Sequence, residues 1–449
     1  MTVRLSGSTR LHLRPAVRQP AYDRDAQACG IVHLGIGAFH RAHQCVYTDD
    51  AMNAGDRGWG ITGVSLRSAD VHEQLAPQEG LYTVSERGPG AQPPRLIGAV
   101  RRVRVGPRDP AAVVAALASP EVHLVTLTVT EKGYLSRGPG SLYDYLGRAL
   151  ALRRAGGHGG LTLLSCDNLP GNGERLAAAL AEYLEAKDSR TARWFRRECA
   201  CPSSMVDRIV PLVADEDRDA VAAEIGMRDE AAVITEPFRQ WVIEDRFAGP
   251  RPRWEVGGAL FVRDVHAYEA AKLRMLNGAH SALAYLGLAR GHAFVHQAIA
   301  DPSIRPLIDR LMRQEAMPTL PAIGMDLARY ADDLVARFAN AALPHRLRQI
   351  AMDGSQKIPQ RWLDVLAWHS GRGQRCPALL AALAAWIDFV RGNGHVVEDP
   401  MATRLASLWA TAGRSGVVAG LFGLNGIFAA SWLAPEADVQ ALTALLRAE

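Results

Sequence analysis

Cys29-Gly-Ile-Val-His-Leu-Gly35-Ile-Gly37-Ala-Phe-His40 decides the fold of the N-terminal half of this chain. Residues 29–34 predict a short buried strand. An amphipathic helix is expected from the glycine turn to about Ala54, where Gly55 is a natural stop. A strand, a glycine turn and a helix in this order form the opening of a dinucleotide-binding βαβ unit.

The hypothesis of dinucleotide binding rests on the two glycines of this turn. Gly35 and Gly37 permit a tight turn and a close approach of the backbone to a pyrophosphate at the helix N-terminus. The third position of the G-x-G-x-x-G pattern is His40 instead of glycine. The pattern is therefore partial, and on its own it is a weak signal.

A second strand is expected over Trp59–Leu66, and charged residues follow it. Asp70 could accept a hydrogen bond from a ribose 2′-hydroxyl, whereas Arg67 could favour a 2′-phosphate. Both could equally be solvated loop charges.

Two further apolar runs predict buried parallel strands, over Val122–Val129 and Leu161–Ser165. The first run opens into Thr130 and Glu131, and the second is followed by Asn168. Ligands of open α/β sheets bind at the carboxyl ends of the strands, so these residues are candidates. Taken alone, Asn168 would more often be a turn former.

The pattern changes at about Arg263, where strand-like runs give way to Ala/Leu-rich helical periodicity. We therefore predict an α/β fold, with a Rossmann-like domain over residues 1–262 and an all-helical domain over residues 263–449. Gly416–Ala434 carries no charge over nineteen residues, which approaches the length of a membrane span. A buried core helix is the favoured interpretation because no second span accompanies it.

The helix expected over Tyr268–Tyr285 carries a set of polar residues. At ~100° per residue, Asn277 and His280 lie about 140° and 80° from Lys272, on one broad side. An amine, an amide and an imidazole could together take a proton from an alcohol and hold the developing oxygen charge. The alternative is a solvated lysine beside a core histidine. We expect this helix at the domain junction, in an interdomain cleft facing the sheet ends.

Composition limits the other functions that need consideration. A net charge of +4 over 449 residues gives no case for nucleic-acid binding, and residues 1–20 contain no apolar run, so no signal peptide is expected. The six cysteines do not form zinc-finger spacings, which favours reduced thiols, a cytoplasmic protein and no metal.

Several segments together resemble the mannitol dehydrogenase family, the polyol-specific long-chain dehydrogenases/reductases. The resemblance extends from Gly35 to the C-terminal helices. Its segments are Gly35-Ile-Gly37-Ala-Phe39-His-Arg41, Thr130-Glu131-Lys-Gly-Tyr134, Cys166-Asp167-Asn168, Ser204-Met-Val-Asp207-Arg208, Gln240-Trp241-Val-Ile-Glu244 and Glu269-x2-Lys272-x4-Asn277-Gly-x-His280.

This resemblance implies a zinc-independent, nicotinamide-dependent alcohol/ketone oxidoreductase of carbohydrate metabolism. In this resemblance Lys272 is the general acid/base. The amides of Asn168 and Asn277 hold the substrate oxygen, and the imidazole of His280 orients the substrate. Asp207 matches a substrate-binding aspartate, and Glu269 matches a glutamate that passes protons to the lysine. The implied cofactor-binding residues are Gly35, Gly37, Phe39, Arg41, Asp70, Thr130 and Glu131.

The segment Asp353-Gly-Ser-Gln-Lys357 resembles the uronate-reducing branch of the family, which interconverts fructuronate and mannonate, and it implicates Lys357 in substrate binding. Mannitol 2-dehydrogenases are expected to carry an arginine where this chain has Gln349. A polyol dehydrogenase acting on mannitol, arabinitol or sorbitol stays the main alternative, and a non-catalytic dinucleotide-binding regulator is a remote one. NAD is expected, with NADP not excluded. The sequence leaves the oligomeric state open.

Overall fold

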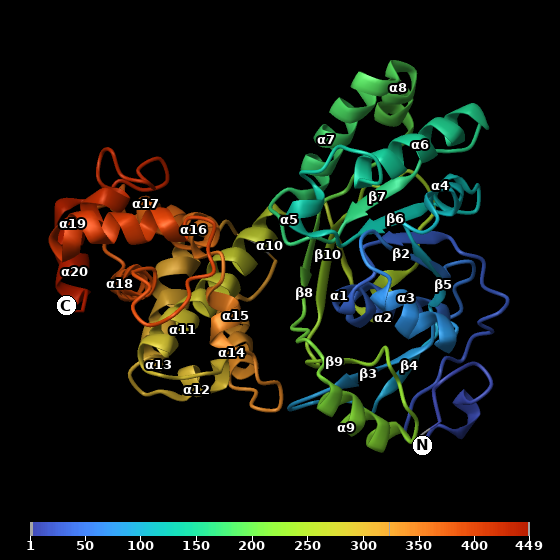
Figure 1. Cartoon of the computed structure of the whole chain (residues 1–449), viewed down its shortest axis with the longest axis horizontal. Helices are drawn as coiled ribbons and strands as arrows, with labels where there is room; N and C mark the ends of the chain where they lie inside the picture. The colour runs from blue at the N-terminus through green and yellow to red at the C-terminus, as the bar shows by residue number, and fades with distance from the viewer. Residues whose placement is uncertain (1–2, 323, 448–449) are drawn as a thin grey trace. The chain divides into compact units, whose positions relative to one another are not determined.

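The computed structural model describes residues 3–322 and 324–447, with the backbone alone for Glu131 and Lys132. The chain forms two compact units, Met1–His266 and Ala267–Glu449 (Figure 1). The dividing point lies four residues beyond the boundary expected from the loss of strand-like runs. The reason is that β11 (Leu260–Val262) is followed by a short connection before α10 (His266–Ala271) begins.

The first unit is built on a parallel sheet with the strand order β5–β2–β1–β6–β7. Its strands are β1 (Ile31–Leu34), β2 (Ile61–Ser65), β5 (Val100–Val105), β6 (Leu124–Leu127) and β7 (Thr162–Ser165). Ile31 of β1 pairs with Ile61 on one side and with Leu124 on the other. The chain therefore adds strands on both sides of β1, and the switch point of the topology lies at the carboxyl end of this strand.

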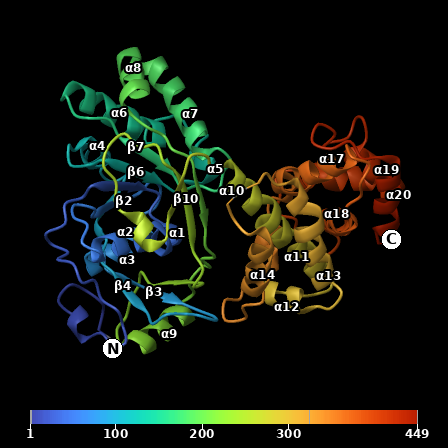
Figure 2. The same cartoon turned by 180° about the vertical axis from the view of Figure 1, so that it is seen from behind.

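Helices cover both faces of this sheet, so its strands β1, β2, β6 and β7 are buried throughout, as apolar runs predict. Val32 and Leu34 pack with residues of α4, α6 and α7, whereas Ile31 packs on the opposite face with residues of α2 (Figures 1 and 2). These helices, with α8 beside them, are α2 (Gln44–Asn53), α4 (Pro110–Ala118), α6 (Leu142–Ala155), α7 (Asn172–Lys187) and α8 (Ser189–Glu198).

Two smaller sheets complete the strands of this unit. One has the order β11–β10–β8, with β10 over Gln240–Glu244 and β8 over Ser204–Asp207; the other has the order β4–β3–β9. The bounds in the latter sheet are β3 (Tyr82–Glu86), β4 (Arg95–Ile97) and β9 (Val233–Thr235). The run Ala231–Glu244 does not form one continuous strand. Pro237 lacks a donor for the ladder, and the chain leaves one sheet there and joins another.

Short elements connect these parts. They are η1 (Arg10–His12), α1 (Ala38–Ala42), α3 (Asp70–Leu75), η2 (Ala76–Gln78), α5 (Thr130–Gly133), α9 (Asp215–Ile225) and η3 (Trp254–Gly257).

All regular elements among the described residues of the second unit are helices, as the sequence predicts. It contains α10, η4 (Lys272–Asn277), α11 (Gly278–Ala289), α12 (Val295–Ala300), α13 (Arg305–Arg310), η5 (Leu311–Ala316), η6 (Met317–Thr319), α14 (Leu327–Phe338), α15 (Leu347–Ala351), α16 (Gly354–Ile358), η7 (Pro359–Leu363), α17 (Asp364–Ser370), α18 (Pro377–Phe389), α19 (Ala402–Phe422) and α20 (Glu436–Leu445). Helix α11 packs against α12, α15 and α18, and forms the centre of the core.

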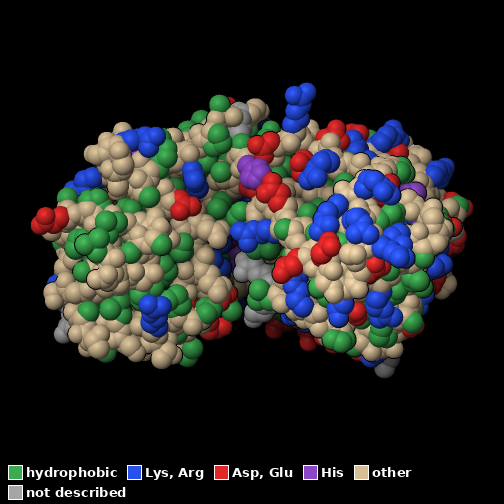
Figure 3. Space-filling view, turned by 90° about the horizontal axis from the view of Figure 1, so that it is seen from above, with side chains coloured by type: hydrophobic (Ala, Val, Ile, Leu, Met, Phe, Trp, Pro, Cys, Tyr) green, Lys and Arg blue, Asp and Glu red, His purple; other side chains and the backbone are tan. Residues whose placement is uncertain are grey.

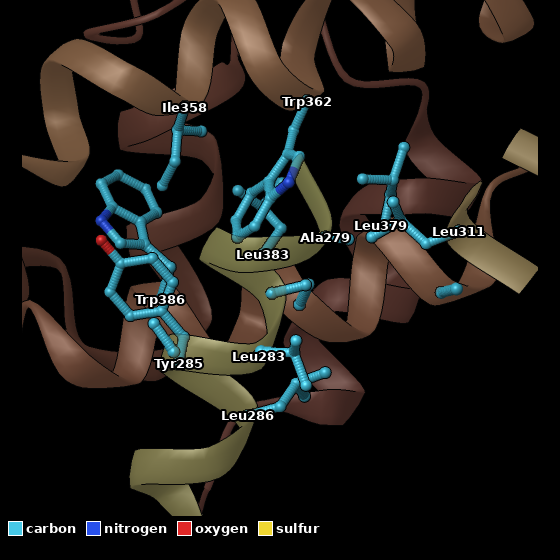
Figure 4. Close-up of a cluster of buried hydrophobic side chains, with 14 of the residues drawn as sticks. Ala279, Leu283, Tyr285, Leu286, Leu311, Ile358, Trp362, Leu379, Leu383 and Trp386 are labelled. Atoms are coloured by element: carbon cyan, nitrogen blue, oxygen red, sulfur yellow. The ribbon is translucent and has the colours of Figure 1, made fainter. Parts of the chain in front are cut away.

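Large aromatic side chains fill that core. Trp362 and Trp386 are fully buried, and Figure 4 shows them beside Tyr285 and Leu283 of α11. Truncating a buried tryptophan to alanine typically costs about 3–5 kcal/mol. The position of α11 is therefore strongly specified by its neighbours.

The apolar segment Gly416–Ala434 differs from the expected helix. Helix α19 is divided by Gly413, whose φ of 60° is non-helical, and it ends at Phe422. Residues 423–434 fold back as turns, with Phe428 N–H donating to the Leu421 carbonyl at 2.8 Å. An added Cβ at Gly426 would lie 2.6 Å from the backbone of Leu421, so the glycines of this segment permit the reversal. Among the described residues, no helix combines the length and the apolar character that a membrane crossing requires.

Candidate active site

The turn between β1 and α1 is shaped by its two glycines. Gly35 has a φ of 94°, and an added Cβ would lie 2.2 Å from the Thr128 carbonyl oxygen. Both features exclude a side chain at this position. Gly37 is extended, and its Cβ would meet nothing closer than the Gly35 carbonyl at 3.8 Å. The protein itself therefore does not require glycine at residue 37, and the space beside it is open to a ligand.

A buried histidine, His33, supports this turn through hydrogen bonds. His33 lies between Thr126 and Thr128, with 2.8 Å from Nδ1 to the Thr126 hydroxyl and 2.8 Å from Nε2 to the Thr128 hydroxyl. The Thr128 hydroxyl donates in turn to the Gly35 carbonyl at 2.8 Å, so it accepts from His33 Nε2–H. Burial lowers the pKa of His33 to about 3, which keeps the ring neutral. His40, in the place of a third glycine, stacks on this ring with centroids 3.3 Å apart.

Phe39 and Arg41 lie on α1. Phe39 is half-buried and stacks on His43 at 5.1 Å. Arg41 is buried, and its guanidinium donates to the Ala231 carbonyl and, at 3.3 Å, to the Gly37 carbonyl. Its pKa is lowered, chiefly by burial. Arg41 thus ties the glycine turn to the chain just before β9, and a direct contact with a cofactor stays a prediction.

Asp70 and Arg67 are both exposed beyond the end of β2. Asp70 is the first residue of α3. Neither the Asp70 carboxylate nor the Arg67 guanidinium has a hydrogen-bond or ion-pair partner among the described residues. Both groups are therefore available to a ribose or its phosphate.

The carboxyl ends of β6 and β7 are joined by a carboxylate. Asp167 is buried and accepts hydrogen bonds from Thr130 N–H at 2.8 Å and from the Tyr134 hydroxyl at 2.9 Å. Burial raises the pKa of Asp167, and these donors oppose that effect. Thr130 has a φ of 64°, which is strained for a β-branched residue. Such strain costs roughly 1–3 kcal/mol and is concentrated at functional sites.

Asn168 follows Asp167 and is exposed at this edge of the sheet, as the sequence predicts. The backbone of Glu131 lies in α5, but its side chain is outside the described residues.

Asp207 is buried at the end of β8, where it pairs with Gln240 of β10. Asn172 links β8 to the chain after β7: its Nδ2 donates to the carbonyls of Asp167 and Ser204 at 2.9 and 2.7 Å, and its Oδ1 accepts from Ser204 N–H at 3.0 Å. These bonds hold the start of β8 beside the residues that follow β7, whereas Asp207 lies at the other end of β8.

The second unit carries the lysine motif on a π-helical turn instead of an α-helix. Element η4 spans Lys272–Asn277, and the N–H of Gly278 reaches back five residues to the Leu273 carbonyl. An i→i+5 turn holds more than four residues, so residues five apart lie closer to one line than on an α-helix. The angle of about 140° expected between Lys272 and Asn277 on an α-helix is therefore too large. The side of the helix that carries Lys272, Asn277 and His280 is narrower than the sequence suggested.

A neighbouring segment satisfies the carbonyl groups where this turn passes into α11. The indole of Trp362 donates to the Gly278 carbonyl at 3.0 Å, and Arg361 donates to the Asn277 carbonyl at 3.4 Å and to the Ser281 hydroxyl at 2.7 Å. Both residues belong to η7, itself a π-helical turn. Figure 4 shows the Trp362 ring directed toward the start of α11.

Two side chains of the motif have polar atoms without partners. Asn277 Nδ2 and His280 Nε2 are buried and have no hydrogen-bond partner among the described residues. The pKa of His280 lies well below its ordinary value because of burial first, and then because of His345, Arg361, Arg337 and Lys357 nearby. Buried polar groups without partners are costly, so these atoms are candidates for contact with a substrate. Lys272 itself is half-buried.

Lys357 and Glu269 are the remaining expected site residues. The Lys357 ammonium donates to the carbonyls of Met352 and Ile350 at 2.5 and 3.4 Å. The structure explains why Asp353 and Gly354 precede this lysine. Asp353 adopts a φ of 55°, and an added Cβ at Gly354 would lie 2.3 Å from the Tyr285 hydroxyl. Glu269 is half-buried on α10, three residues before Lys272.

Sequence reasoning missed the residues that support the site. His33 and Asn172 belong to no recognised motif. Tyr134 and Asp167 lie within the segments that resemble the family, but the sequence assigned them no role. Only their spacing from strand ends could have pointed to them. Within the described residues, no group of three or more His, Cys, Asp or Glu could hold a metal ion.

A hollow of about 290 Å³ lies elsewhere in the second unit. Its lining includes Leu288 and Ala289. These residues are in the last turn of α11, the end away from Lys272, so the hollow is separate from the motif. Seen from above, the surface of the molecule carries Lys and Arg side chains interspersed with Asp and Glu (Figure 3).

The turn at Gly35 and Gly37 fits a nicotinamide dinucleotide. It lies at the carboxyl end of the switch-point strand, a Cβ at residue 37 would fill the open space, and the exposed Asp70 follows the next strand.

Comparisons with known proteins agree with this arrangement. Residues 29–256 match the mannitol dehydrogenase Rossmann domain, and residues 264–440 match the mannitol dehydrogenase C-terminal domain. The chain is 40% identical to the uncharacterized oxidoreductase YeiQ of Escherichia coli (strain K12), covering 92% of this chain and 90% of that protein. It is 39% identical to D-mannonate oxidoreductase of the same strain, covering 92% and 91%.

A solved structure extends the similarity to three dimensions. The ternary complex of Pseudomonas fluorescens mannitol 2-dehydrogenase with NAD and D-mannitol is similar with a TM-score of 0.88 at 33% identity, covering 99% of this chain and 96% of that one. The resemblance and the fold class expected from the sequence are thereby confirmed. The chain belongs to the mannitol dehydrogenase family and is an NAD(P)-dependent oxidoreductase that acts on CH–OH groups of polyols or sugar acids.

Proposed function

We propose that this oxidoreductase reversibly reduces a keto-uronate, fructuronate, to its aldonate, mannonate. One observation carries the proposal. Asn277 Nδ2 and His280 Nε2, which have no hydrogen-bond partner among the described residues, lie on the same helical stretch as Lys272, and Arg361, Arg337 and Lys357 make the surroundings of His280 electropositive. An anionic sugar gains from such surroundings, and guanidinium groups bind carboxylates in a bidentate manner. The 39% identity to D-mannonate oxidoreductase supports the same assignment.

Lys272 is the general acid/base of this proposal. In reduction its ammonium gives a proton to the carbonyl oxygen as the alcohol forms, and in oxidation its neutral amine takes that proton back. When bound, the dinucleotide supplies the hydride for reduction and accepts it in oxidation. Glu269 passes protons between Lys272 and solvent.

The amides of Asn168 and Asn277 hold the substrate oxygen while its charge changes, which is worth about 2.7–4 kcal/mol per donor in comparable sites. His280 orients the substrate, and Asp207 and Lys357 bind its remaining polar groups. Because Lys272 performs the proton transfer, we expect no metal requirement. EDTA treatment should leave the activity intact, and a loss that added Zn²⁺ restores would contradict this.

The cofactor-binding residues of the proposal are Gly35, Gly37, Phe39, Arg41, Asp70, Thr130 and Glu131. We expect NAD to be preferred to NADP, because Asp70 is the exposed acid closest to the end of β2.

A polyol dehydrogenase is the second candidate function. The observation that favours it is the similarity to a mannitol 2-dehydrogenase whose structure contains D-mannitol. Purified protein should therefore be assayed for oxidation of NADH and of NADPH with fructuronate, tagaturonate and fructose, and for the reverse reactions with mannonate and mannitol. The proposal expects kcat/KM for fructuronate to exceed that for fructose by at least tenfold. Equal values, or a preference for fructose, would support the polyol dehydrogenase.

A further inference from the structure

A second histidine ring lies against the ring of His280. His345 precedes α15, and the two ring centroids are 4.9 Å apart with the planes at 73°. Its Nδ1 is buried and has no hydrogen-bond partner among the described residues, like Asn277 Nδ2 and His280 Nε2. A separate segment of the chain thus adds a third partnerless polar atom to the group on η4 and α11.

Backbone contacts fix the position of His345. Its carbonyl accepts a hydrogen bond from Val295 N–H at 3.0 Å, where α12 begins. The following residue, Arg346, forms an isolated β-bridge with Phe294 and lies over its ring at 5.3 Å. Phe338 also packs against the His280 ring, with 5.4 Å between the centroids. The imidazole of His345 is therefore held in place by groups that leave its Nδ1 unbonded.

Both imidazoles are neutral at ordinary pH. Burial lowers the pKa of His345, and burial together with nearby cations lowers that of His280 further. A neutral imidazole offers one donor and one acceptor, and a hydroxyl group likewise offers both. A carboxylate only accepts, and it is served better by Arg361, Arg337 or Lys357, whose charges act on His280. The chemistry of the histidine pair therefore matches the hydroxyl-bearing part of a sugar.

We propose that His345 is a further substrate-contacting residue, whose Nδ1 forms a hydrogen bond with one hydroxyl group of the sugar chain. This deepens the function proposed above: cationic side chains recognise the charged end of the substrate, and His345 recognises a hydroxyl group beside the one bound by His280. Specificity among sugars then depends on whether a hydroxyl group is present at that carbon and has the right configuration.

The test compares two replacements of His345. His345→Phe keeps an aromatic ring against His280 but removes Nδ1, and His345→Asn places an amide near the position of Nδ1. His292→Phe is the matched control, because His292 Nε2 already bonds Asp301 Oδ2 at 2.9 Å. Each variant is assayed with the substrate that the wild-type enzyme prefers and with a series of analogues that each lack one hydroxyl group.

His345→Phe should raise KM about three- to tenfold with kcat nearly unchanged, the range for one lost hydrogen bond. It should also abolish the discrimination against one particular deoxy analogue. His345→Asn should restore most of both properties, and His292→Phe should change neither. A purely structural role for His345 would lower the melting temperature without altering the deoxy profile. An unchanged KM and deoxy profile in His345→Phe would overturn the proposal.

Failure of the proposed function would be recognised separately. If the wild-type enzyme prefers mannitol to mannonate, the uronate assignment fails, and the same variants are assayed with deoxy polyols. Nitrogen NMR of histidine-labelled protein gives a readout that needs no turnover. The His345 Nδ1 resonance, assigned through His345→Asn, should shift when mannonate or mannitol is added. The absence of a shift with both would contradict the proposal.

Discussion

Lys272 occupies the first position of a turn whose hydrogen bonds reach back five residues. Turns of this kind are frequent at functional sites. Here the geometry brings the amide of Asn277 toward the same line as the lysine, and it leaves Asn277 Nδ2 without a partner among the described residues. At the scale of single residues, the candidate site is therefore marked by buried polar atoms such as Asn277 Nδ2, which have no hydrogen-bond partner among the described residues.

The first prediction concerns the lysine. Lys272→Ala should reduce kcat by orders of magnitude in both directions while NADH affinity, measured by fluorescence titration, stays nearly constant. External primary amines should restore part of the rate. In the wild-type enzyme, oxidation requires the neutral amine and should become faster as pH rises, and reduction requires the ammonium and should become slower. Lys187→Ala, on the exposed surface of α7, is the control. A Lys272→Ala variant with more than about a tenth of wild-type kcat would have lost less than ~1.4 kcal/mol, too little for the principal acid/base.

The second prediction concerns cofactor choice. Asp70→Ala should weaken NADH binding about tenfold or more, because a hydrogen bond to a charged group is worth roughly 1.5–3 kcal/mol. NADPH binding should change much less, since the 2′-phosphate replaces the hydroxyl group that Asp70 would bind. Arg67→Ala is the matched variant, and it should affect NADPH more than NADH. If Asp70→Ala weakens both cofactors equally, Asp70 does not contact the ribose.

At the scale of elements, the two glycines of the β1–α1 turn differ in whether the fold itself requires glycine. Gly35 is required by its positive φ and by the Thr128 carbonyl oxygen, which would lie 2.2 Å from an added Cβ, whereas Gly37 is adjacent to open space. The third prediction follows from this difference. Gly37→Ala should keep the wild-type melting temperature but raise the Kd for NADH at least tenfold. Gly35→Ala should lower the melting temperature by several degrees. Unchanged NADH affinity in Gly37→Ala would show that the dinucleotide does not approach this residue.

The sequence predicts elements well where one local pattern determines them. The apolar runs that become β1, β6 and β7 predicted parallel strands, and the glycine turn placed the ligand-facing edge. The π-helical turn could not be predicted, because it depends on Trp362 and Arg361, which lie 84 residues from the carbonyl groups they bond. His40 was recognised as a departure from the glycine pattern, but its stacking on His33 depends on tertiary structure.

At the scale of the whole molecule, both units bury neutral histidines. Burial lowers the pKa of His33 and His43 to about 3 in the first unit, and the pKa values of His40, His280 and His345 are also lowered. On unfolding, such a ring regains an ordinary pKa near 6.5. Below that pH the unfolded chain binds protons that the folded chain does not, so stability falls as the solution becomes more acidic.

Carboxyl groups act in the opposite direction at lower pH. Burial raises the pKa of Asp229 and Asp167, so the folded protein takes up these protons first and is stabilised by them as pH falls. This effect begins at the raised pKa of each folded carboxyl group and is complete once the pH falls below the unfolded value near 3.9. A comparison of the wild type with a single histidine variant over the interval from pH 7.5 to 5.5 cancels this contribution, because both proteins keep the same carboxyl groups.

The last prediction uses that interval. For His33, whose folded pKa is about 3, the free energy of unfolding should fall by about 1.4 kcal/mol between pH 7.5 and 5.5, because pH 5.5 lies one unit below the unfolded pKa. His33→Asn removes this group, so its stability should depend less on pH by this amount, even though the loss of the bonds to Thr126 and Thr128 lowers its stability at pH 7.5. Replacing the exposed His12 by asparagine should leave the dependence unchanged. Urea unfolding at pH 7.5, 6.5 and 5.5 measures the difference. Equal slopes for wild type and His33→Asn would mean that His33 is protonated in the folded protein, and that it cannot accept from Thr126 while donating to Thr128.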